Sequence, residues 1–228
     1  MKKFRLFLLG LLFLSLFALP NVTTAQSLQF TLPVAEVEAY IEEDGTLSLY
    51  YILVFQNSPN GAPIDFLDIG MPTSAYNLKN IEADIDGQPI TDVEDSPYVS
   101  NGFALGLGDK TIQPGQSGQV NIWVTGVQNV LYPYEDREDY ASFLFSPNYF
   151  GPEYDRSNNT EYRVTLILPP GVGDDEGIYY YPENWPGDQE PDDVGRTADG
   201  DRVYYSWYTD NADVHTEYRF GAAFPSSY

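Results

Sequence analysis

The sequence predicts an all-β fold, an immunoglobulin-like antiparallel β-sandwich, with a second smaller β lobe as a variant of it. Three observations support this class. Apolar and polar residues alternate with a period of two in most segments, and Gly, Pro, Asn and Asp separate the segments at short intervals. No stretch of useful length shows the periodicity of an amphipathic helix.

The first 25 residues are predicted to be a secretory signal peptide. Residues 1–5 form a short basic segment with Lys2, Lys3 and Arg5, and residues 6–19 form a mainly apolar run. Thr23 and Ala25 provide the small side chains that a cleavage site needs. The apolar run is shorter than the roughly 20 residues of a membrane-spanning helix. We therefore expect a secreted or cell-surface, extracytoplasmic protein whose mature chain does not itself span a membrane.

The remainder, residues 26–228, is predicted to form the β-sandwich ectodomain. Its clearest hairpin joins strands at 36–42 and 46–55 through Asp44-Gly45, because both turn residues tolerate positive φ. Residues 64–69 form a further candidate strand. A second hairpin, 81–90, turns at Asp86-Gly87, and its Pro89 indicates a sheet edge.

Further strands follow in the second half of the chain. In the segment 119–125, Val120, Ile122 and Val124 are expected to face inward and Trp123 outward. Another strand covers 162–168 and ends at Pro169-Pro170-Gly171. The acidic stretch 173–200 reads as a long surface loop before two last strands, 202–208 and 216–224. An internal boundary is placed between 129 and 159, where Pro, Tyr and charged residues cluster.

Composition excludes several classes of function. The sequence has no cysteine, which excludes disulfides, thiolate metal sites and a cysteine nucleophile. Without residues 1–25 the chain keeps 8 basic and 34 acidic residues, a net charge of −26. Such a surface repels phosphate backbones, so nucleic acid is not expected as a partner.

Three pieces of the chain carry a resemblance to a known family. They are the hairpin Ile41–Leu47, the segment Leu105–Asp109 before the turn at Pro114-Gly115, and the strand end Val164–Gly171. Across residues 34–172 their order resembles the extracytoplasmic N-terminal region of a family of predicted bacterial membrane proteins of unknown function. The resemblance implies a surface β-sandwich followed by membrane helices, which this sequence lacks, and it implies no catalytic residues. The chain is expected to be secreted whole or to form the front of a longer product.

Catalytic chemistry has little support in the sequence. His215 is the only histidine, and no G-x-S-x-G segment accompanies it, so a Ser-His-Asp triad is not expected. A pair of carboxylates for glycoside hydrolysis remains an alternative, because acidic residues are abundant. Calcium is the cation that acidic loops favour. Its candidate ligands are Asp188, Glu190, Asp192, Asp193, Asp199 and Asp201.

Aromatic residues supply the other signal. The 19 Tyr, 13 Phe and 3 Trp exceed what one core of this size holds, so some are expected at the surface, beside carboxylates. The candidate ligand-binding residues are Trp123, Tyr181, Trp185, Tyr205 and Trp207. Packing between strands is the competing explanation for these rings.

The sequence therefore favours a non-enzymatic, exported interaction module that binds an unidentified protein or glycan at the cell exterior. The alternatives are a carbohydrate-binding module with a calcium-ordered acidic loop, and a glycoside hydrolase that uses a carboxylate pair. No cofactor other than calcium is expected.

Overall fold

The computed structural model describes residues 27–151, 153, 155 and 159–228. The predicted signal peptide, 1–25, lies outside these residues. Regular structure in the described part consists of β-strands and two 3-10 turns, η1 (Leu78–Asn80) and η2 (Gly108–Lys110). None of its helices has the length and apolar character that crossing a membrane requires. The predicted all-β class is confirmed.

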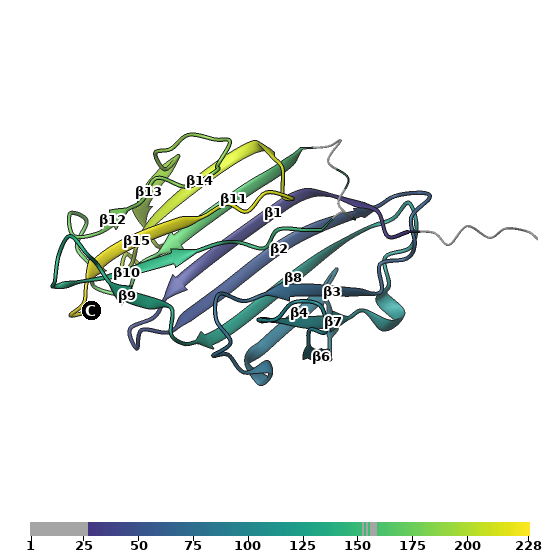
Figure 1. The fold of residues 1–228 in the computed structure, drawn as a ribbon, viewed down its shortest axis with the longest axis horizontal. Coiled ribbons are helices and arrows are strands. Elements are labelled where there is room, and N and C mark those ends of the chain that lie inside the picture. The colour runs from purple at the N-terminus through teal and green to yellow at the C-terminus, as the bar shows by residue number, and fades with distance from the viewer. Residues whose placement is uncertain (1–26, 152, 154, 156–158) are drawn as a thin grey trace, which may run out of the picture.

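One large sheet forms the first layer of the fold (Figure 1). Its eight strands follow one another in the order β13 (Asp193–Arg196), β14 (Val203–Ala212), β11 (Thr160–Ile167), β1 (Phe30–Ile41), β2 (Leu47–Asn57), β8 (Ser117–Val127), β4 (Ile81–Ile85) and β5 (Gln88–Ile90). The strand that contains Pro89 lies at the edge, as predicted, because proline cannot donate a ladder hydrogen bond.

Two smaller sheets form the second layer. One has the order β12 (Ile178–Tyr179), β15 (Phe220–Pro225), β10 (Tyr140–Phe145) and β9 (Leu131–Pro133). The other has the order β3 (Phe66–Gly70), β7 (Gly102–Gly106) and β6 (Asp92–Asp95). Buried side chains from all three sheets belong to one hydrophobic core, so the fold is a sandwich with a divided second layer.

Alternation along the strands explains which face is buried. In β2 the residues Leu47, Leu49, Tyr51, Leu53 and Phe55 are all buried, as the period of two predicted. The same holds for Val120, Ile122 and Val124 in β8, whereas Trp123 between them faces away from the core. The side of the large sheet opposite the core is called the outer face below.

One strand pair departs from the antiparallel expectation. Strands β1 and β11 run parallel, with Val37 opposite Val164. The alternation in each strand shows only which residues face the core and does not encode the direction of a neighbour. The parallel pair therefore had no signal in the sequence.

The predicted boundary between 129 and 159 is wrong. Strand β1 precedes this segment and β11 follows it, yet the two are neighbours in the large sheet. Within the segment, β10 pairs with β15 from the C-terminal end of the chain. Sheets that join both sides of the segment cannot separate there into independent domains.

The stretch 173–200 is mostly loop, as predicted, but it contains the short strands β12 and β13. Strand β13 lies at the sheet edge and pairs only with β14 among the described strands. Asp193 and Arg196 at its ends are exposed, so the strand lacks the apolar alternation that would have identified it.

Two buried tyrosines give a matched test of the core. The Tyr51 hydroxyl is buried and has no hydrogen-bond partner among the described residues. Burial raises the pKa of Tyr51, and the Asn148 amide, which lies outside hydrogen-bond geometry, offsets only part of this effect. In contrast, the Tyr218 hydroxyl donates to the Asp213 carbonyl at 3.0 Å and accepts from the Asp213 N–H at 2.9 Å.

We expect Tyr51→Phe to raise the free energy of unfolding by about 1 kcal/mol, because it removes a buried polar atom without a partner. Tyr218→Phe should lower this free energy by about 1–2 kcal/mol, because it breaks two hydrogen bonds. Urea unfolding followed by circular dichroism measures both. A loss of stability in Tyr51→Phe that equals the loss in Tyr218→Phe would contradict the assignment.

Candidate functional site

Polar and aromatic side chains cross the outer face in one register. Each residue of this row is the direct cross-strand partner of the next, from β13 to β4. The row consists of Asp193, Ser206, Thr165, Glu38, Tyr50, Trp123 and Glu82. With strands about 4.8 Å apart, it extends over roughly 30 Å. The row therefore spans seven strands of the large sheet, and Ser206 within it is buried.

Trp123 is the central aromatic residue of this face. Its ring contacts the rings of Tyr40 and Tyr50, with centroid distances of 5.6 and 5.4 Å and interplanar angles of 58° and 54°. The Tyr40 hydroxyl donates to the Glu38 carboxylate, and burial together with this hydrogen bond raises the pKa of Tyr40. These two ring contacts hold the indole in place while it remains partly exposed.

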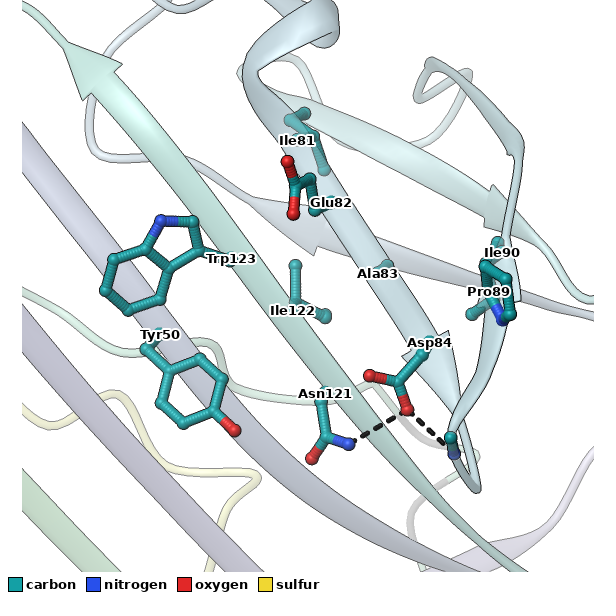
Figure 2. A pocket seen from close by; sticks show the side chains of 11 residues that line it. Tyr50, Ile81, Glu82, Ala83, Asp84, Pro89, Ile90, Asn121, Ile122 and Trp123 are labelled. Carbon is teal, nitrogen blue, oxygen red and sulfur yellow. Dashed lines mark hydrogen bonds between the residues drawn. The ribbon is translucent and has the colours of Figure 1, made fainter.

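A groove of 560 Å³ opens on one side of Trp123. Figure 2 shows Trp123 and Tyr50 along one side of it and Glu82 and Asp84 along the other. Asp84 is held in place, because its Oδ1 accepts from Asn121 Nδ2 at 3.0 Å and from the Gly87 N–H at 2.9 Å. Of the described residues, the only charged ones that line this groove are Glu82 and Asp84. It is called the acidic groove below.

A larger groove of 950 Å³ lies on the other side of Trp123 and is lined by charges of both signs. Its acidic residues are Glu38, Glu42, Asp193 and Asp199, and its basic residues are Arg163, Arg196 and Arg202. Arg202 Nη2 pairs with Glu42 Oε2 at 2.6 Å and Arg202 Nη1 donates to the Ile41 carbonyl at 3.0 Å. It is called the mixed groove below.

Most of the predicted ligand-binding aromatics are not available to a ligand. Trp185, Tyr205 and Trp207 are 5%, 4% and 0% exposed and belong to the core, which corrects their assignment as surface residues. Both tryptophans pack against Phe220, with ring centroids 5.2 and 5.3 Å apart. Tyr205 and Trp207 occupy alternate positions of β14, so both point to the same, inner side.

Tyr181 is 62% exposed but lies away from Trp123, in the segment after β12. Its hydroxyl donates to Glu190 Oε1 at 2.8 Å, and Tyr179 donates to Glu190 Oε2. These donors, Tyr179 first, lower the pKa of the Glu190 carboxyl group. Of the five predicted ligand-binding residues, Trp123 alone lies on the outer face.

The predicted calcium ligands are not brought together. Asp192 accepts from the Tyr208 N–H at 2.7 Å, Asp193 from the Tyr204 hydroxyl at 2.8 Å, and Asp199 from the Thr197 hydroxyl at 2.5 Å. The described residues contain no group of three or more histidine, aspartate or glutamate side chains placed to hold one metal ion. The prediction of a calcium site formed by Asp188, Glu190, Asp192, Asp193, Asp199 and Asp201 is therefore wrong.

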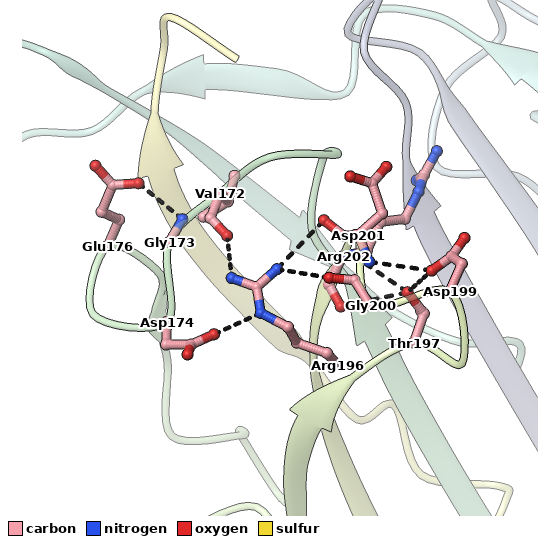
Figure 3. Close-up of polar contacts among 10 residues, drawn as sticks. All are labelled: Val172, Gly173, Asp174, Glu176, Arg196, Thr197, Asp199, Gly200, Asp201 and Arg202. Atoms are coloured by element: carbon pink, nitrogen blue, oxygen red, sulfur yellow. Dashed lines mark hydrogen bonds and ion pairs between the residues drawn. The ribbon is translucent and has the colours of Figure 1, made fainter.

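An arginine orders part of the acidic loop instead (Figure 3). Arg196 Nε donates to Asp174 Oδ1 at 2.7 Å, Nη2 donates to the Val172 carbonyl at 3.0 Å, and Nη1 donates to the Gly200 carbonyl at 3.2 Å. The guanidinium group thus links two loop segments through side-chain and main-chain oxygens, which is the type of ligand that a hard cation would have used.

His215 contributes no recognisable catalytic arrangement with the residues that the structure describes. Its Nδ1 lies 3.1 Å from the Gly151 carbonyl oxygen, and the Asp213 carboxylate accepts from the His215 backbone N–H. A triad instead requires a carboxylate that orients the histidine ring toward a nucleophile.

Sequence reasoning missed the neighbours of Trp123, namely Tyr40, Tyr50, Glu82 and Asp84. A usable signal was present, because all four occupy outward positions of their strands. Only the strand order, β1-β2-β8-β4, reveals that these positions are adjacent.

Comparison with known proteins identifies the fold alone. No family model and no curated protein matches the sequence, so the resemblance to a bacterial membrane-protein family stays a prediction. An M1 zinc metallopeptidase from Deinococcus radiodurans has a TM-score of 0.52 and 10% identity, covering 88% of this chain and 43% of that chain. A mutant of this peptidase bound to a Tyr-Ser-Ala substrate has a TM-score of 0.51 and 10% identity, covering 86% and 43%. This chain spans less than half the length of those structures.

Proposed function

We propose that this protein is an exported, non-enzymatic β-sandwich that binds a protein or glycan at the cell exterior through the outer face of its large sheet. The single observation that carries the proposal is Trp123, which packs against Tyr40 and Tyr50 and lines both grooves. Export rests on residues 1–25, whose pattern is that of a signal peptide.

Physical reasons favour the outer face as a binding surface. Preorganised aromatic anchors lose little conformational entropy on binding, and they dominate the energetics of many interfaces. Trp123 has this property because its two tyrosine neighbours and the β8 backbone fix its position. The two grooves beside it provide the recesses in which the groups of a partner are recognised.

Enzymatic alternatives have weaker support. The two similar structures named above are zinc metallopeptidases, and their low identity carries no activity over to this chain. A glycoside hydrolase needs a carboxylic acid with a raised pKa. Each carboxyl pKa shift found among the described residues is instead a lowering, because hydrogen-bond donors stabilise the ionised forms of Asp44, Glu176, Glu190 and Asp199.

The proposal is tested with the variant Trp123→Ala on arrayed glycans and peptides. We expect binding to the recognised probes to fall at least about tenfold, since truncation of a central aromatic anchor commonly costs about 2 kcal/mol or more. Tyr181→Ala serves as the matched control, because it removes an exposed aromatic ring away from the outer face.

Circular dichroism is the check that both variants are folded. Equal binding by Trp123→Ala and the unchanged protein would reject the outer face as the site. Turnover of peptide or glycan substrates by the purified chain, lost on substitution of one carboxylate, would reject the non-enzymatic assignment.

A further inference from the structure

We infer that the acidic groove binds a basic side chain, lysine or arginine, presented by a polypeptide partner. This inference rests on the proposed function, because it assigns an occupant to part of the outer face. It is carried by the combination of an aromatic side, an acidic side and a lining in which none of the described residues is basic.

The aromatic side provides the first half of the recognition. The rings of Trp123 and Tyr50 both line the groove, with centroids 5.4 Å apart. A cation over the face of an aromatic ring is attracted by the ring quadrupole, most strongly for tryptophan. Tyr40, which lines the mixed groove, packs against Trp123. The indole is therefore already held in position before a ligand binds.

The acidic side provides the second half. Glu82 is the direct cross-strand partner of Trp123, and Asp84 is the partner of Asn121. Figure 2 shows both carboxylates across the groove from the aromatic rings. Asn121 and Gly87 both donate to Oδ1 of Asp84 and so fix the position of its carboxylate in the groove. No basic residue of the described lining is available to pair with this carboxylate.

Charge complementarity selects the occupant. Among the described residues, two acids and no base line the acidic groove, whereas three arginines line the mixed groove. An anionic ligand would therefore be repelled from the acidic groove, whereas a basic side chain would pair with its carboxylates. The net charge of −26 that the chain has without residues 1–25 adds long-range attraction for a basic partner.

The position of the acidic groove indicates a side chain rather than an enclosed small molecule, and its volume of 560 Å³ is large enough for a long basic side chain. The groove lies on the face of the sheet between β2, β8 and β4, so the backbone that carries an inserted side chain stays outside. Aromatic stacking and paired carboxylates both suit the planar guanidinium of arginine particularly well.

The test is calorimetric titration of the purified chain with capped tetra-arginine and tetra-lysine peptides. Capped tetra-glutamate and a neutral glucan oligosaccharide are the comparison probes. The double variant Glu82→Gln/Asp84→Asn should weaken binding of the basic peptides about tenfold, as expected for loss of charge-assisted contacts. The amide that replaces the Asp84 carboxylate keeps an oxygen that accepts from Asn121 and Gly87, so the fold of the groove is preserved.

Glu94→Gln/Asp95→Asn is the matched control, since it also removes two negative charges, from exposed positions of β6 that line neither groove. It should change the affinity less than about twofold, and added salt should weaken binding of the unchanged protein. Equal weakening by the control and the double variant would overturn the inference, because the attraction would then be only that of the net charge.

Other outcomes separate this inference from the proposed function. If the neutral oligosaccharide binds in a Trp123-dependent manner while the carboxylate variants bind it normally, the outer face is a binding site but its occupant is not a basic side chain. If neither the basic nor the neutral probe binds in a manner that depends on Trp123, both the inference and the proposed function are rejected.

Discussion

Replacing Trp207 with alanine should lower the free energy of unfolding by about 3–5 kcal/mol, the range found for buried aromatic residues. The indole is fully buried, and its ring packs on Phe220 at 5.3 Å and on Tyr179 at 6.1 Å. It joins β14 of the large sheet to β15 and β12 of the smaller one. Its Nε1 also donates to the Gln189 carbonyl at 3.2 Å. Alanine therefore leaves a cavity between the layers and a carbonyl without its donor.

Urea unfolding followed by circular dichroism measures the loss, with Trp123→Ala as the matched control. The control removes the same side chain from a partly exposed position, so it should cost clearly less stability while it weakens binding. Trp207→Phe should recover part of the loss because it refills most of the cavity. A smaller loss for Trp207→Ala than for Trp123→Ala would contradict the assignment of these residues to core and surface.

The contrast between these two tryptophans shows what the sequence could predict. Trp123 follows Ile122 and precedes Val124, so alternation alone predicts that it faces away from the core, and the structure confirms it. Trp207 lies in a run of aromatic residues, Tyr204 to Tyr208, where nearly every position is large and partly apolar. In such a run the period of two has little contrast between the faces, and only the position of the second layer decides which residues are buried.

Strand neighbours were less predictable than the strands themselves. The hairpin of β1 and β2 could be identified because its turn residues and both strands are local in the sequence. The pairing of β1 with β11 joins residues more than a hundred positions apart and leaves no local pattern. The acidic groove depends on such pairings, because Glu82 lies beside Trp123 only through the pairing of β4 with β8.

The acidic loop shows why composition alone misjudged a metal site. Oxygen ligands were abundant, as a calcium site requires, but several of them have local donors. Arg196, Thr197 and Tyr204 stand within or near the same loop and donate to Asp174, Asp199 and Asp193. The number of acidic residues says nothing about these donors. Counting the donors as well as the acceptors would have favoured a loop whose carboxylates are satisfied by hydrogen bonds within it.

The second large loss of stability is expected on substitution of Asn57, which is a fully buried polar residue at the end of β2. Its Nδ2 donates to the carbonyl oxygens of Ala62 and Ile112, at 2.9 Å in both cases. The side chain thereby ties β2 to the segment that precedes β3 and to the segment that precedes β8. Asn57→Asp keeps the shape of the side chain but replaces the donor with an oxygen that faces two carbonyl oxygens.

We expect Asn57→Asp to lower the free energy of unfolding by at least about 3 kcal/mol at neutral pH, because it buries a charge that lacks a partner. Burial raises the pKa of the introduced carboxyl group above its unfolded value of about 3.9. A raised pKa means that stability is retained below the unfolded value and lost as the pH rises through the folded one. The deficit relative to the unchanged protein should therefore shrink as the pH is lowered toward about 4.

Urea titrations of Asn57→Asp, Asn57→Ala and the unchanged protein at a series of pH values test this expectation. Asn57→Ala breaks the same two hydrogen bonds without adding a charge, so its smaller deficit, about 2 kcal/mol, should not depend on pH. A pH-independent deficit for Asn57→Asp would mean that its carboxylate reaches water. The tie between β2 and the two segments would then be loose enough to open in the folded protein, contrary to the full burial of Asn57.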